Sequence, residues 1–265
     1  MAHISSIRIA NFRNIRNQAI VGLYCKHPHT INMFVGGNAS GKTSLLDAIN
    51  LATSEPMNQN VDVEWTEGCN KTCVFFRSNR HQSKVGGVQI SLIANQQYDD
   101  DLNRIATFVA KTVQSQSRRA VGRYAGTAKN VQWLGALNMF WSLFRNNGTT
   151  FDTDFVSPED FDNPDWNLFL FKGDERICSV DEMSAGEVDA IAFAVPFITM
   201  PNSYYNGVVL IDDIEAHMTQ EWATSLLLAL RTMLPEAQFI VTTRLTGWSI
   251  PDCAVYDMGA ITGRA

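Results

Sequence analysis

A glycine-rich segment near the start of the chain has residue types that can hold phosphate groups. It reads Gly36-Gly37-Asn38-Ala39-Ser40-Gly41-Lys42-Thr43, with Ser44 directly after it, and fits the pattern G-x-x-x-x-G-K-[ST]. Glycines let successive backbone N–H groups point at phosphate oxygens, and a helix N-terminus adds partial positive charge. Lys42 would bridge the β- and γ-phosphates of a nucleoside triphosphate, and the Thr43 hydroxyl would bind Mg²⁺. The segment therefore predicts a site for ATP and Mg²⁺.

An apolar strand that ends in two carboxylates supplies a second part of such a site. Val208-Val209-Leu210-Ile211 is followed directly by Asp212 and Asp213. In proteins with this phosphate loop, an acid at the end of a buried strand holds Mg²⁺, and we assign that role to Asp212. The two adjacent carboxylates repel each other, and a divalent cation would offset that repulsion. A strand that ends in an acidic turn is common elsewhere, so the assignment depends on the phosphate loop.

Strand and helix patterns alternate around both motifs. Strands are predicted at 4–9, 17–24, 30–35, 72–77, 88–94, 166–171, 207–211 and 238–243. Helices are predicted at 42–53, 99–119, 131–144, 186–199 and 220–234, with an acidic loop over 152–165. Pro196 is expected to bend or shorten the helix that contains it. This order predicts a split α/β domain, residues 1–98 and 166–265, interrupted by a mainly helical lobe over 99–165.

A short motif, Ser184-Ala185-Gly186-Glu187, opens one of the predicted helices before the acidic strand. Taken alone it could be a plain helix cap. In the order phosphate loop, helical lobe, S-x-G-[EQ] and acidic strand, the chain resembles the ABC ATPases. Ile7 to Asn14 (IRIANFRN) and Asp212 to His217 (DDIEAH) resemble the RecF/SMC branch, which includes the overcoming-lysogenization-defect ATPases of phage defence.

The resemblance implies a P-loop NTPase head of the ABC type, with a mixed sheet, an antiparallel β subdomain and an inserted mainly helical lobe. It also implies a homodimer in the ATP state and ATP hydrolysis. Ser184, Gly186 and Glu187 of one copy would then cap the γ-phosphate held by Lys42 of the other copy. Physically, this is an anion bound at a helix N-terminus.

Two positions depart from the sequence motifs of the family. Asp213 stands where the family has a catalytic glutamate, so hydrolysis is expected to be slow unless Glu215 helps to polarise the water. Arg244 stands where the family has a switch histidine. It could contact the γ-phosphate as a cationic sensor or be an ordinary surface arginine. For the family's Q-loop glutamine, Gln96 and Gln97 are the candidates.

These features predict an ATP-gated dimer that controls DNA engagement or a partner effector in DNA repair or antiviral defence. A chain of 265 residues leaves no room for a separate nuclease domain, so a nuclease effector would come from another chain. DNA is a candidate partner. Two alternatives stay open: the nucleotide-binding subunit of an ABC transporter, and a nearly inactive nucleotide sensor.

The composition is that of a globular protein and excludes several classes. Apolar residues make up 45% of the chain, and the net charge of −6 argues against a basic nucleic-acid binder. No segment approaches the roughly 18 apolar residues of a membrane span. The five cysteines show neither disulfide-scaffold nor zinc-site spacing. A cytoplasmic location is therefore expected, with no membrane partner.

Overall fold

The computed structural model describes residues 3–15, 19–23, 31–54, 60–66, 73–78, 128–155, 166–199, 207–248 and 250–263. The chain divides into two compact units. The first contains Met1–Val85, Asn202–Thr224 and Arg231–Ala265, and the second contains Gly86–Pro201 and Ser225–Leu230. The phosphate loop and the paired carboxylates therefore belong to the first unit, and the Ser184 motif belongs to the second.

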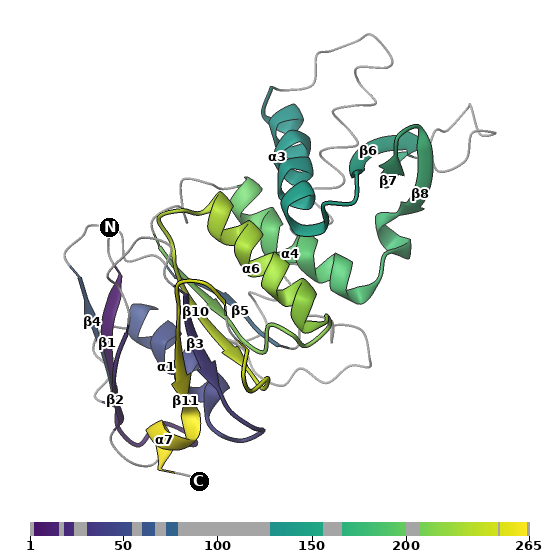
Figure 1. Cartoon of the computed structure of the whole chain (residues 1–265). Helices are drawn as coiled ribbons and strands as arrows, with labels where there is room; N and C mark the ends of the chain where they lie inside the picture. The colour runs from purple at the N-terminus through teal and green to yellow at the C-terminus, as the bar shows by residue number, and fades with distance from the viewer. Residues whose placement is uncertain are drawn as a thin grey trace, which may run out of the picture. The chain divides into compact units, whose positions relative to one another are not determined.

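A five-stranded parallel sheet forms the centre of the first unit (Figure 1). Its order is β11-β3-β10-β9-β5, and every neighbouring pair is parallel. The strands are β3 (Ile31–Val35), β5 (Cys73–Phe76), β9 (Val208–Ile211), β10 (Gln238–Thr243) and β11 (Cys253–Asp257). Strands β9 and β10 are buried along their whole length. This burial explains the unbroken apolar run of β9 and the apolar centre of β10, because parallel strands are covered on both faces.

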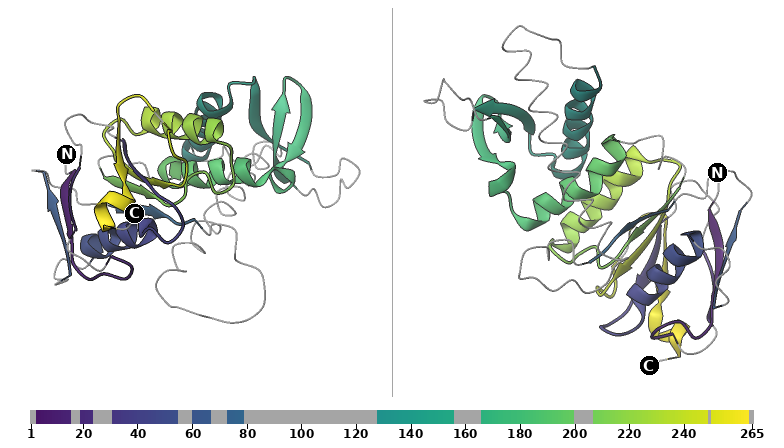
Figure 2. Two further views of the ribbon diagram at one scale, coloured as in Figure 1. Left: turned by 60° about the horizontal axis from the view of Figure 1, so that its bottom comes forward. Right: turned by 180° about the vertical axis from the view of Figure 1, so that it is seen from behind.

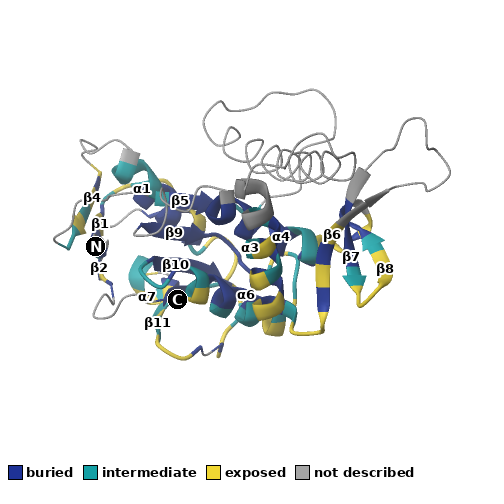
Figure 3. Cartoon of the chain, turned by 90° about the horizontal axis from the view of Figure 1, so that it is seen from above, coloured by how far each residue is buried: buried dark blue, intermediate teal, exposed yellow. Residues whose placement is uncertain are grey.

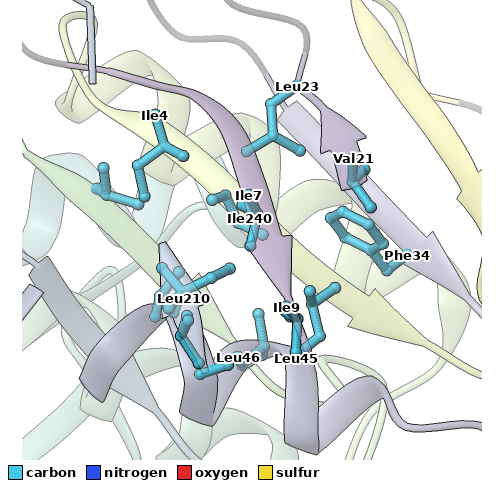
Figure 4. Packing of buried hydrophobic residues seen from close by; sticks show 14 of the residues in the cluster. Ile4, Ile7, Ile9, Val21, Leu23, Phe34, Leu45, Leu46, Leu210 and Ile240 are labelled. Atoms are coloured by element: carbon cyan, nitrogen blue, oxygen red, sulfur yellow. The ribbon is translucent and has the colours of Figure 1, made fainter. Parts of the chain in front are cut away.

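Helix α1 (Lys42–Ser54) lies between the parallel sheet and a smaller antiparallel sheet (Figures 1 and 2). The small sheet has the order β2-β1-β4, with β1 (Ile4–Ile9), β2 (Ala19–Gly22) and β4 (Val61–Trp65). Buried side chains of both sheets and of the helix form one hydrophobic core (Figures 3 and 4), which includes Ile7, Leu46 and Leu210. The helix that follows the phosphate loop is therefore packed on two faces.

The side chain of Gln238 also joins the two sheets of the first unit. Its Oε1 accepts a hydrogen bond from the backbone N–H of Ile4 at 2.7 Å, and its Nε2 donates to the Ile4 carbonyl at 2.9 Å. Gln238 is buried, so these contacts satisfy backbone groups that water does not reach. The start of β1 is thereby fixed to the start of β10.

The register of the parallel sheet brings several loop starts to one edge. Val35 is level with Thr243, and Ile211 is level with Phe76. The phosphate loop, the paired carboxylates and the residues after β5 and β10 therefore begin side by side. This is the edge at which ligands bind in open α/β sheets.

The second unit combines helices with an antiparallel sheet of order β6-β7-β8. Its elements are α3 (Ala128–Arg145), β6 (Thr149–Phe155), β7 (Trp166–Lys172), β8 (Glu175–Ser179), the short 3₁₀-helix η1 (Val180–Glu182) and α4 (Ala185–Thr199). Trp141 is fully buried, stacks edge-on against Phe151 with ring centroids 4.9 Å apart, and donates from Nε1 to Thr149 Oγ1 at 2.8 Å. These contacts hold α3 against β6.

Two further helices complete the chain. Helix α6 (Gln220–Met233) has both ends in the first unit, while its middle residues, Ser225–Leu230, group with the second. Helix α7 (Met258–Thr262) follows β11 and places the buried side chain of Met258 beside the phosphate loop.

The α/β class and the antiparallel subdomain predicted from the sequence are confirmed. The predicted strands and helices that fall on described residues are present as β1, β2, β3, β5, β7, β9, β10, α1, α3, α4 and α6. The predicted strand at 88–94 and helix at 99–119 lie outside the described residues. Strands β4, β8 and β11 were not predicted.

One local expectation was wrong, and a second is reduced to one of its two alternatives. The loop expected from Asp152 is strand up to Phe155, because alternation along β6 buries Phe151 and leaves Asp152 exposed. Pro196 was expected to bend or shorten its helix, and shortening is excluded because the helix continues to Thr199, the predicted end. Its residues Phe197 and Ile198 are buried, and that packing outweighs the hydrogen bond that proline removes.

Among the helices that the structure describes, none has the length and apolar character needed to cross a bilayer.

Candidate nucleotide-binding site

The phosphate loop connects β3 to α1 and has a tightly packed backbone. The N–H of Gly36 donates to the Thr243 carbonyl at 3.2 Å, and the N–H of Leu45 donates to the Gly41 carbonyl at 2.9 Å. Ala39 and Gly41 have positive φ angles of 62° and 99°. The loop therefore curls as the sequence pattern requires, and its last turn passes directly into the helix.

Gly36 is the glycine whose missing side chain matters most to the loop. A Cβ at this position would lie 2.5 Å from Ser40 Oγ and 2.9 Å from Met258 Cβ. A Cβ at Gly37 would meet nothing within 4 Å. Close packing against α7 thus explains the first glycine of the motif, whereas the second tolerates a side chain in the folded structure.

Lys42 turns its ammonium group back over the loop. Its Nζ donates to the carbonyl oxygens of Gly36 at 2.7 Å and Gly37 at 3.0 Å, and it lies 3.8 Å from Asp213 Oδ1. Only 6% of the side chain is exposed. A buried positive charge thus lies inside the loop, where phosphate oxygens would be its natural partners.

Asp212 is held by hydroxyl groups from two other elements. Thr43 Oγ1 donates to Oδ2 at 2.9 Å, and Thr242 Oγ1 donates to Oδ1 at 2.7 Å. Burial raises the pKa of this carboxyl above its ordinary value, and the charge of Asp213 adds to the rise. Hydrogen bonds from Thr242, Thr43 and Ser78 lower the pKa and offset part of that rise. Burial and the charge of Asp213 thus disfavour the ionised form of Asp212, and a bound cation would favour that form.

Asp213 is fixed by its backbone as well as by its side chain. Its N–H donates to Thr242 Oγ1 at 2.9 Å, and its φ angle is +43°. Arg244 donates to Asp213 Oδ2 from Nε at 3.2 Å and from Nη2 at 2.7 Å. These hydrogen bonds and the charge of Asp213 raise the pKa of the Arg244 guanidinium.

Three buried polar atoms around this cluster have no hydrogen-bond partner in the described part of the chain. They are Ser40 Oγ, Asp213 Oδ1 and Glu215 Oε2. Glu215 Oε1 accepts a hydrogen bond from the N–H of Arg244 at 2.7 Å. Such orphaned atoms are uncommon in folded proteins and are typical of positions where a ligand or an ordered water binds.

The donor set fits Mg²⁺ bound together with a nucleotide. Among the described residues, no group of three or more His, Cys, Asp or Glu side chains could hold a metal ion by itself. Mg²⁺ keeps several water ligands and needs only one or two protein carboxylates beside substrate phosphates. Thr43 and Asp212 meet that need without further acids.

A buried carboxylate within α1 was not singled out from the sequence. Asp47 forms ion pairs with Arg13 and with Arg77, the latter at 2.8 Å, and the Arg77 guanidinium lies 4.5 Å from the centre of the Phe75 ring. Arg13 belongs to the N-F-R-N segment, whose role in the structure is therefore to tie the small sheet to α1. Nothing in the sequence pattern distinguishes Asp47 from an exposed acid on a helix.

Ser78 and Thr242 are two further residues that sequence reasoning missed. Both contact Asp212. The Q-loop candidates Gln96 and Gln97 lie outside the described residues. The available signal for Ser78 was a hydroxyl residue two positions after the end of β5, because β5 pairs with β9 and ends at the same edge.

The Ser184 motif forms the start of α4 in the second unit. Glu187 Oε2 accepts hydrogen bonds from the N–H of Ser184 at 3.1 Å and from its hydroxyl at 2.8 Å. This is the reciprocal contact of a capping box. Ser184 is exposed and Gly186 is buried, so the serine is the accessible part of this helix start.

We predict that Gly36→Ala destabilises the protein by about 1–3 kcal/mol, because an added Cβ overlaps both Ser40 and Met258. Gly37→Ala is the matched control and should change the free energy of unfolding by less than about 0.5 kcal/mol. Urea unfolding of both variants checks this. Equal losses in the two variants would contradict the packing described for the loop.

We also predict that Asp212→Asn raises the melting temperature of the nucleotide-free protein by a few degrees at neutral pH. A raised carboxyl pKa means that the folded state disfavours the charge, and this penalty is full above the raised pKa. The penalty disappears as the pH falls through that pKa toward 3.8, the ordinary value. The stabilisation should therefore shrink on acidification, as thermal unfolding at several pH values would show; destabilisation at every pH would contradict it.

Comparison with known proteins places this site in a family. Residues 3–249 match the RecF/RecN/SMC N terminal domain. Two relatives, both named DNA replication and repair protein RecF, come from the SM101 and ATCC 13124 strains of Clostridium perfringens. Each is 32% identical over 87 residues, a stretch that spans 31% of this chain but only 22% of the relative.

A solved structure of similar fold is that of an SMC head bound to the C-terminal winged-helix domain of ScpA. It has a TM-score of 0.53 at 13% identity and covers 92% of this chain and 90% of that chain. The family match covers more than nine-tenths of the sequence and includes the phosphate loop, the Ser184 motif and the acidic strand. The chain belongs to the RecF/RecN/SMC N-terminal domain family.

Proposed function

We propose that this chain binds ATP with Mg²⁺ and hydrolyses it, and that two copies close around the nucleotide to control DNA engagement or a partner effector. The observation that carries the proposal is the convergence of four side chains at one sheet edge. Lys42 Nζ lies 3.8 Å from Asp213 Oδ1, and Thr43 Oγ1 lies 2.9 Å from Asp212 Oδ2. Members of this family are ATPases.

Each residue of the cluster has a role that follows from its chemistry. The N–H groups of the loop and the Lys42 ammonium would hold the β- and γ-phosphates. Thr43 and Asp212 would hold Mg²⁺, which neutralises charge that develops on the phosphate oxygens. Asp213, with Glu215 beside it, would orient the attacking water. Because phosphoryl transfer depends mainly on positioning, a fixed carboxylate serves this reaction even if it is a weak base.

The Ser184 motif is the proposed contact across the dimer. Ser184 is exposed at the start of α4, and Glu187 holds its hydroxyl and N–H. In the proposed dimer, Ser184 and Gly186 of one copy face the γ-phosphate held by Lys42 of the other. Dimer formation then depends on the γ-phosphate, so ATP and ADP states differ in their contacts, as any nucleotide-driven switch requires.

The names of the similar proteins suggest which partners this chain could have. The relatives in Clostridium perfringens are named as DNA replication and repair proteins, and the SMC head of similar fold binds the winged-helix domain of ScpA. A head of this fold can therefore carry a protein partner. We propose DNA or an effector chain such as a nuclease as the target of the switch, in DNA repair or antiviral defence.

A nearly inactive nucleotide sensor is the second candidate, and one observation favours it. The carboxylate at the catalytic position, Asp213, is paired with Arg244, whose guanidinium occupies Oδ2 and offsets the negative charge. In a sensor, ATP would close the dimer and hydrolysis would be too slow to reopen it. ATP turnover that Asp213→Asn abolishes would exclude this candidate. The transporter alternative gains no support from the family match.

The proposed dimer predicts complementation between two variants that each fail alone. Lys42→Ala lacks a working phosphate loop but keeps the Ser184 motif, and Ser184→Arg blocks the motif but keeps the loop. Because one intact composite site can form in a mixture, light scattering with slowly hydrolysed ATPγS and Mg²⁺ should show dimers only in the mixture and in the wild type.

Ser184→Arg should bind nucleotide as a monomer and melt within a few degrees of the wild type, because Ser184 is exposed and loses only a helix cap. Dimers of Ser184→Arg alone, or a mixture that stays monomeric, would contradict the composite site. A wild type whose mass is the same with and without nucleotide would contradict the dimer altogether.

A further inference from the structure

Arg244 is fixed at both its backbone and its side chain. Its N–H donates to Glu215 Oε1 at 2.7 Å, and its guanidinium binds Asp213 Oδ2 through two nitrogens. Half of the Arg244 side chain is exposed, whereas only 13% of the Asp213 side chain is. The arginine therefore approaches the carboxylate from the outer side, and it contacts one of the two carboxylate oxygens.

The other carboxylate oxygen of Asp213 is left without a hydrogen bond among the described residues. Oδ1 is buried, and Lys42 Nζ lies 3.8 Å from it. Because Arg244 occupies Oδ2 and Thr242 holds the backbone N–H, Oδ1 is directed toward the lysine that would grip the phosphates. A buried acceptor beside the reacting phosphate is what an attacking water requires.

We propose that Arg244 is a positioning residue: it holds Asp213 so that Oδ1 receives the attacking water, and it acts through this aspartate rather than on the γ-phosphate itself. This role rests on the proposed ATPase function. The aspartate side chain is one methylene shorter than a glutamate, so its carboxylate reaches less far. The arginine holds that carboxylate where Oδ1 can accept a hydrogen bond from the attacking water. The guanidinium binds Oδ2, whereas Oδ1 is the oxygen that lies near Lys42, and this division agrees with a supporting role.

The reaction that this arrangement serves balances as follows. The water oxygen bonds to the γ-phosphorus, the bond from that phosphorus to the β–γ bridging oxygen breaks, and ADP keeps the electron pair. One water proton stays on the inorganic phosphate, and the other passes through Asp213 Oδ1 to solvent. Arg244 neither gives nor takes a proton, because its guanidinium stays charged.

The test compares ATP turnover and ATP affinity for Arg244→Gln, Asp213→Asn and the double variant. Misplacing a catalytic group by about 1 Å can lower a rate by about 100-fold, so Arg244→Gln should lower kcat by roughly 10- to 100-fold. The Kd for a fluorescent ATP analogue should stay within about twofold. Arg244→Lys should recover part of the rate, since a lysine keeps the charge but not the two-nitrogen contact.

The double variant separates action through Asp213 from direct action on the phosphate. If Arg244 works through the aspartate, Arg244→Gln adds nothing to the defect of Asp213→Asn, as expected for residues that act as a unit. Sensitive single-turnover measurements with radiolabelled ATP keep the residual rates measurable. Arg8→Gln, on the exposed face of β1, is the control for loss of an arginine outside the site.

Two results would overturn this role while leaving the ATPase intact. One is a kcat of Arg244→Gln equal to or above that of the wild type. The other is a Kd that rises about tenfold together with additive losses in the double variant, which would make Arg244 a direct phosphate sensor. Failure of the proposed function would give a different result. If the wild type hydrolysed ATP no faster than the Lys42→Ala variant, the ATPase function would be overturned and, with it, the role of Arg244.

Discussion

The hydrogen bonds that Thr43 and Thr242 donate to the buried Asp212 carboxylate connect the three segments of the site. They join the phosphate-loop helix to the ends of β9 and β10. A buried carboxylate beside a second one is costly, as the raised pKa of Asp212 shows. The fold retains this cost at the position where Mg²⁺ would remove it. The pair of buried carboxylates thus lowers stability locally, and a bound cation would offset that loss.

The rest of the first unit serves to keep these groups in place. Parallel pairing places the ends of β3 and β10 level with each other and the ends of β5 and β9 level with each other, so the residues directly after these strands lie close together. Packing between two sheets holds α1, and the buried Asp47 adds ion pairs to Arg13 and Arg77. Met258 closes the outer side of the loop against Gly36. A nucleotide would therefore meet a largely preformed site.

The sequence alone was sufficient for the groups that lie within one segment. The pattern from Gly36 to Thr43 and the strand before Asp212 are local signals, and both stand where they were expected. The pairing of Arg244 with Asp213 could not be read in the same way, because it depends on the register between β9 and β10. Asp47 was missed since its burial comes from tertiary packing. Strand β6 was mistaken for a loop because of its acidic residues, but Asp152 lies on the exposed face, where an aspartate is compatible with a strand.

Titration of ATP into the wild-type protein with Mg²⁺ and with EDTA tests the central claim most directly. If Lys42, Thr43 and the buried Asp212 form one triphosphate site, ATP binds at least about tenfold more tightly with Mg²⁺, a difference of about 1.4 kcal/mol. Lys42→Ala should remove binding in both conditions. Equal affinity with Mg²⁺ and with EDTA, or no binding by the wild type, would contradict the account.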